Sequence, residues 1–158
     1  MPEIKRLING QDIMPATITG SNVASNTLSN AQIGLAASAS NSVTTAVTTT
    51  STTAHSTVNS LSFTPAKTGK VLVIARLIVN NSTAGDGVSV ELLNGSTVVD
   101  GPYTLISSAA SQNQVVTLMA LLSGLTVGTA VTLSTAVEAV TGGTASATGI
   151  LVAMELLA

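Results

Sequence analysis

The residues that could carry out chemistry are few and scattered along the chain. His55 is the only histidine, cysteine is absent, and seven acidic residues are spread over 158 positions. A catalytic histidine needs a carboxylate to orient it, and none lies near His55 in the sequence. The sequence therefore predicts no catalytic residues and no cofactor.

The acidic residues show no metal-ligand spacing. They match no calcium-binding loop, and we interpret Asp86 and Asp100 as turn residues. A calcium site assembled between subunits is left as an alternative, but no metal site is predicted within the chain. The glycines form no nucleotide-binding loop, and Gly142 with Gly143 indicates a turn that requires positive φ. An enzyme is therefore the least favoured class of protein.

Arg76 is the most informative charge because it interrupts VLVIARLIV, a segment that is apolar on both faces. An unpaired guanidinium would be costly to bury in such a strand. We expect its side chain to reach a sheet edge or to meet Glu91 or Glu155 across an interface. That role is structural.

The composition describes a chain with very little surface charge. Only 8% of the residues are charged, whereas 45% are hydrophobic. A monomer normally relies on a charged surface to stay apart from its neighbours, so we expect much of this surface to be buried against other chains. The net charge of −2 favours neither nucleic acid nor an anionic membrane as a partner. The strongest apolar run, residues 71–79, is too short to span a membrane.

Residues 1–35 carry a large apolar residue at every fifth position, a period that suits neither a helix nor a plain strand. The spacing fits a coil of a β-solenoid, or an extended arm that places one anchor per step into a neighbour's surface. Six steps are too few to bury a core alone, so we expect partner chains to order this segment. The predicted anchors are Ile8, Ile13, Ile18, Val23, Leu28 and Ile33.

Residues 36–57 form a Ser-, Thr- and Ala-rich segment that contains no charged residue other than the titratable His55. Its β-branched residues favour extended backbone, and its small side chains allow chains to approach closely. We interpret this segment as a linker or stalk between the arm and a folded domain.

Residues 58–158 read as short strands separated by turn residues, which predicts an all-β sandwich. Asn94-Gly95 is a strong hairpin signal. Several strands are apolar on both faces, whereas one face of each sheet in a lone sandwich meets water. We interpret the second apolar face as a subunit interface. Its predicted residues are Leu72, Ile74, Arg76, Ile78, Leu118 and Leu151.

The layout of this domain resembles the jelly-roll trimers of the tumour necrosis factor type, which also occur in phage fibre knobs and capsid decoration proteins. The matching segments are LSFTPAKTGKVLVIARLIV, VSVELLNGSTVV, LSGLTVGTAVTL and GILVAMELL. The resemblance implies a jelly-roll sandwich that assembles as a homotrimer. The chain departs from the pattern because Phe63 and Tyr103 are its only aromatic residues, so its core must be aliphatic.

The segment LINGQDIMPATITGSNVASNTLSNAQIG also looks like the openings of phage tail and fibre proteins, in which such arms hold subunits to the particle. The two resemblances imply a structural protein of the virion. The leading hypothesis is a capsid decoration, or cement, protein whose arm binds the major capsid protein. The alternative is a fibre or receptor-binding protein joined to tail or fibre proteins. A signalling trimer is a third hypothesis, and the phage-like arm counts against it.

Overall fold

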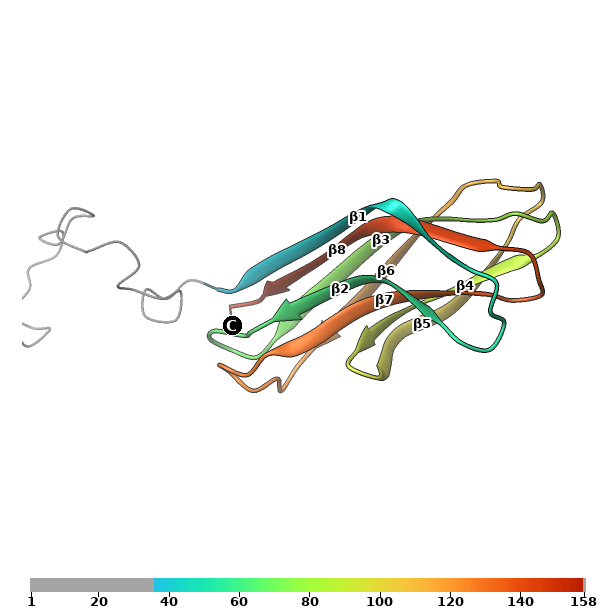
Figure 1. Cartoon of the computed structure of the whole chain (residues 1–158). Helices are drawn as coiled ribbons and strands as arrows, with labels where there is room; N and C mark the ends of the chain where they lie inside the picture. Colours follow the sequence, from blue (N-terminus) through green and yellow to red (C-terminus); the bar gives the residue numbers. More distant parts are fainter. Residues whose placement is uncertain (1–35, 158) are drawn as a thin grey trace, which may run out of the picture.

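The structure, a computed structural model, describes residues 36–157. Eight β-strands make up its regular structure, and no helix occurs among these residues. Figure 1 shows them as two layers that run along the long direction of the domain. The strands are β1 (Ser38–Thr49), β2 (Ser56–Phe63), β3 (Val71–Asn81), β4 (Gly87–Asn94), β5 (Thr97–Ile106), β6 (Gln114–Leu122), β7 (Val131–Ala139) and β8 (Ala145–Glu155).

The strands form two four-stranded sheets. Sheet I has the order β1-β8-β3-β6, and sheet II has the order β2-β7-β4-β5. All paired strands are antiparallel, and the chain passes between the sheets at most connections. This interleaving is the jelly-roll topology, so the prediction of an all-β jelly-roll sandwich is confirmed.

The core lies between the two sheets and is almost entirely aliphatic. Alternate residues of β3 point into it, because successive side chains of a strand face opposite sides. Leu92 and Leu133 from sheet II are fully buried against Leu77 and Leu151 from sheet I. Phe63 is the one aromatic residue in this core. Small Ala and Val side chains fill the rest, which lets the sheets pack closely without rings.

The sandwich begins at β1 and not at residue 58. Residues 38–49, which the sequence suggested were part of a linker or stalk, pair with β8 from Ser38 opposite Met154 to Thr49 opposite Ala145. Val47 and Ala39 pack against the core from this strand. The β-branched composition does favour extended backbone, but that backbone completes sheet I. The arm expected over residues 1–35 lies outside the described residues.

Two predicted turns are present. Asn94-Gly95 joins β4 to β5, and Gly95 has a φ of +61°. Gly143, with a φ of +66°, lies in the β7–β8 connection, where an added Cβ would collide with the Asn81 side chain. The buried Asn81 amide donates to the carbonyl oxygens of Gly87 and Gly142, each at 3.0 Å. One side chain therefore ties together two loops at this end of the sandwich.

Candidate interaction surface

His55 lies between β1 and β2, against two carboxylates that are distant in sequence. Its Nδ1 is 3.5 Å from Glu91 Oε1 and 3.5 Å from Glu138 Oε2. The sheet brings these groups together, since β2 pairs with β7 and β7 pairs with β4. The sequence did not reveal this cluster because its members come from three separate segments. When His55 is protonated, the cluster fastens the β1–β2 connection to sheet II.

Within residues 36–157, no group of three or more acidic or histidine side chains is arranged to hold a metal ion. The same residues contain no helix long and apolar enough to cross a membrane.

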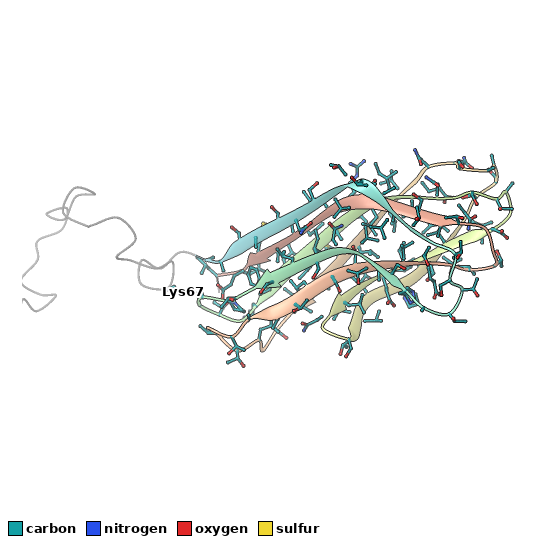
Figure 2. All side chains as sticks on the ribbon, in the orientation of Figure 1. Lys67 is labelled. Atoms are coloured by element: carbon teal, nitrogen blue, oxygen red, sulfur yellow. The ribbon has the colours of Figure 1, made fainter. Side chains whose placement is uncertain are left out.

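Glu155 is a buried carboxylate at the end of β8 that is surrounded by backbone donors. Its oxygens accept hydrogen bonds from the N–H groups of Ala66, Lys67 and Thr68 at 2.6 to 2.8 Å. The N–H groups of Ala37 and Gly69 also donate to it, at 3.2 and 3.1 Å. Lys67 marks this β2–β3 connection in Figure 2. The start of β1 and the C-terminal end lie close by in Figure 1.

The surroundings of Glu155 shift its pKa in two opposite directions. Burial by itself raises the pKa of this carboxyl, because a charged group loses hydration. The backbone hydrogen bonds from Ala66, Thr68, Lys67 and Ala37 act more strongly together, and they lower the pKa to about 2. The ionised Glu155 carboxylate therefore connects the end of β8 to the start of β1 and to the β2–β3 connection through hydrogen bonds.

Asp100 connects the two edge strands β5 and β6 and also holds Tyr103 of its own strand. Asp100 Oδ2 accepts the Met119 N–H at 2.7 Å, and Asp100 Oδ1 accepts the Tyr103 hydroxyl at 2.8 Å. The hydrogen bond to the Asp100 carboxylate raises the pKa of the Tyr103 phenol. Asp86, in the β3–β4 turn as the sequence suggested, accepts the Thr141 hydroxyl at 2.7 Å. All five acids among residues 36–157 are thus engaged with a partner.

The most prominent surface feature is the outer face of sheet I, the side of β1, β8, β3 and β6 that points away from the core. The pairing of the four strands aligns its side chains in cross-strand rows. From β6 to β1 the rows are Leu121, Leu72, Met154 and Ser38; Met119, Ile74, Val152 and Ser40; Thr117, Arg76, Ile150 and Ser42; and Val115, Ile78 and Thr148.

This outer face is apolar and open to solvent. Leu121 is 64% exposed, Met119 60% and Val115 53%. A charged or hydroxyl-bearing residue is the usual occupant of such a position, since antiparallel sheets commonly have one face on the core and one solvated. An apolar patch that spans three neighbouring strands is typical of a surface that another molecule covers.

Four of the six residues predicted for the subunit interface lie on this outer face: Leu72, Ile74, Arg76 and Ile78. Leu118 and Leu151 do not, because both are fully buried in the core. Each pairs with Ala75, whose side chain points inward, and residues opposite each other share a face. The prediction had the wrong phase of alternation for β6 and β8, because the two faces of each strand are almost equally apolar.

Other residues of β6 and β8 lie on the outer face but were not predicted from the sequence. Val115, Met119 and Leu121 on β6, with Ile150, Val152 and Met154 on β8, complete the apolar rows. The register against β3 identifies them, and that register is not visible in a single strand. The one charged residue of β8, Glu155, lies on the core side of the strand, where charged residues are uncommon. Its position therefore suggests the wrong face as the exposed one.

Arg76 lies in the middle of the outer face, exposed and beside a shallow groove of about 460 Å³. Ser42 and Thr44 from β1, Ile78 from β3 and Ile150 from β8 line the groove with it. β1 is irregular between Val43 and Val47 at this point. Within the chain Arg76 does not meet Glu91 or Glu155, since Glu91 is occupied by His55 and Glu155 by the β2–β3 connection.

Comparisons with known proteins give no family. No family model matches the chain, and no curated protein matches it. Among solved structures, a chain in the structure of infectious bursal disease virus, Gx strain, is similar at a TM-score of 0.47 and 9% identity, over 75% of this chain and 33% of that one. A Stig cyclase, FisC from Fischerella sp. TAU, solved with an indole compound, gives 0.38 and 14%, over 58% of this chain and 52% of that one. This chain therefore spans a third to a half of their lengths, and at these scores neither similarity carries an argument about function.

Proposed function

We propose that this protein is a non-enzymatic structural component of a virus particle, a homotrimer that decorates the capsid and binds the major capsid protein through its N-terminal arms. The observation that carries the proposal is the outer face of sheet I, where three neighbouring strands expose aliphatic rows on a chain with only 8% charged residues. A face of this kind is stable in water when other chains cover it.

The affinity would come from aliphatic contacts repeated over many copies. Each square ångström of apolar surface removed from water contributes roughly 25 cal/mol, so a single arm with six large apolar anchors binds with moderate strength. Three arms on one homotrimer make the second and third contacts intramolecular, which raises the overall affinity. This avidity suits a protein that stays on a particle without covalent links.

The alternative, a fibre or receptor-binding protein, shares the arm and the sandwich but makes contact with a host. Sugar rings stack on exposed aromatic side chains, and Tyr103 is the one such residue in the chain outside the core. Its hydroxyl is held by Asp100. The described surface therefore favours decoration over glycan binding.

The test is a sedimentation assay of binding to capsids that lack this protein. We expect the full chain to co-sediment and the variant Ile18→Ser with Val23→Ser to lose most of that binding. The matched control replaces the preceding residues, Thr17→Ser with Asn22→Ser, and should bind as the full chain does. Equal binding by both variants, or by a chain without residues 1–35, would exclude attachment through the arm. Binding only to tails would favour the fibre alternative.

A further inference from the structure

Arg76 is a cation on an apolar surface. No acidic side chain among residues 36–157 forms an ion pair with it, and all five acids in that range have other partners. Covering the outer face of sheet I would remove water from the guanidinium, which is costly unless a carboxylate arrives with the covering group. An occupant that brings apolar side chains together with an acidic group would match both the apolar rows and Arg76.

Two acidic side chains of the sequence remain, Glu3 and Asp12, and both belong to residues 1–35. Asp12 is followed directly by Ile13, one of the apolar residues that recur at every fifth position. This segment therefore combines the two kinds of group that the outer face requires. A second sandwich packed face to face would instead bring one Arg76 towards another.

The length of the chain before β1 allows this segment to reach another copy. Glu155 Oε2 accepts the Ala37 N–H, and the Glu155 N–H donates to the Ala37 carbonyl at 2.8 Å, so Ala37 pairs with the last residue of β8. The 23 residues between Asp12 and Ala36 can extend over roughly 80 Å, which is ample to reach a neighbouring subunit.

We propose that, before the protein attaches to a particle, the N-terminal segment of one copy lies across the outer face of sheet I of a second copy, with Asp12 against Arg76. The proposal rests on the homo-oligomer of the proposed function. It assigns the groove beside Arg76 to the stretch around Asp12 and Ile13 of another copy. Attachment to a particle would then transfer the arm from a subunit to the shell.

Introduced cysteines can test the pairing, since the full chain contains none. Two differently tagged full-length chains are co-expressed, one with Ile13→Cys and the other with Thr117→Cys, which lies beside Arg76 in the same row. After oxidation we expect a disulfide between the two chains. The matched control places the second cysteine at Ser62, an exposed position on sheet II, and should give little product.

Charge exchange then tests Asp12 directly. Asp12→Arg on the Ile13→Cys chain should lower the yield of the disulfide about tenfold, in line with a charged hydrogen bond lost from a covered site. Adding Arg76→Asp on the Thr117→Cys chain should restore it. An unchanged yield with Asp12→Arg would overturn the pairing of Asp12 with Arg76.

Two results would overturn the assignment to a second copy. One is a yield no higher than that of the Ser62 control. The other is a disulfide that forms only within a single chain carrying both Ile13→Cys and Thr117→Cys. These assays contain no capsids, so their failure is separate from that of the proposed function, which the sedimentation assay measures.

Discussion

At the scale of single residues, the polar groups of this chain hold segments together. Glu155 joins β8 to the β2–β3 connection and the start of β1, and Asp100 links the edge strands β5 and β6. The sequence could not predict these roles. Their partners are backbone N–H groups and side chains tens of residues away, and one chain read linearly does not show which loops meet.

Replacing Glu155 should be costly for stability. In Glu155→Gln the amide nitrogen turns a donor towards backbone N–H groups that need an acceptor, and the charge-assisted hydrogen bonds are lost. We expect the free energy of unfolding to fall by about 3 kcal/mol. Glu138→Gln, at a more exposed carboxylate, is the control and should change it by less than about 1 kcal/mol. Urea denaturation measures both, and equal effects would contradict the assigned role.

The same carboxylate predicts an acid-sensitive fold. Its pKa is about 2 in the folded protein against 4.5 for an ordinary glutamate, so folding favours the ionised form. This contribution to stability is complete above pH 4.5 and is lost as the pH falls from 4.5 towards 2. Unfolding free energies measured across that window should decline in the native protein. The free energy of unfolding of Glu155→Gln should decline less steeply over the same pH range. Parallel pH curves for the two proteins would contradict the prediction.

At the scale of elements, hydrophobic pattern and turn residues predicted most strands but not the phase of every one. The segments VLVIARLIV and VSVELLNGSTVV correspond to β3 and to the β4–β5 hairpin, and GILVAMELL covers the second half of β8. β1 was missed because its Ser- and Thr-rich sequence has few large apolar residues, as suits an edge strand. In β6 and β8 both faces are apolar, so only the register against β3 separates core from surface.

Leu118 and Met119 are adjacent residues, one buried in the core and the other exposed on the outer face. Truncating Leu118 should therefore destabilise the fold far more than truncating Met119. Leu118→Ala opens a cavity between the sheets and should lower the free energy of unfolding by about 3 kcal/mol. Met119→Ala removes an exposed side chain and should change it by less than about 0.5 kcal/mol while weakening self-association. Denaturation and light scattering check the pair, and the reverse order would contradict the register.

Gly149 is a point of close approach in β8, between Val43 of β1 and Leu77 of β3. An added Cβ would collide with the Arg76 carbonyl oxygen and the Leu77 side chain. Gly149→Ala should therefore lower the melting temperature, by an amount that corresponds to about 2 kcal/mol. Thr148→Ala, the neighbouring residue, should leave it almost unchanged. Calorimetry gives both values, and a neutral Gly149→Ala would show that sheet I can shift to make room.

At the scale of the whole molecule, the outer face of sheet I and the N-terminal segment are two apolar parts of one chain with little charge. We propose that contacts between copies, and then with a capsid, cover them. The sequence alone predicted that other chains would bury much of the surface, and that stays a prediction. The structure shows an exposed apolar face on sheet I. It does not describe residues 1–35, so their anchors remain predictions.

The most direct test of the account is a cryo-electron microscopy map of the native virus particle in which this chain is located. If the protein decorates the capsid, we expect density for its jelly roll on the capsid lattice, at threefold or quasi-threefold positions, with arms reaching the neighbouring capsid subunits. Density only on a tail or fibre would contradict capsid decoration and move the function to host attachment.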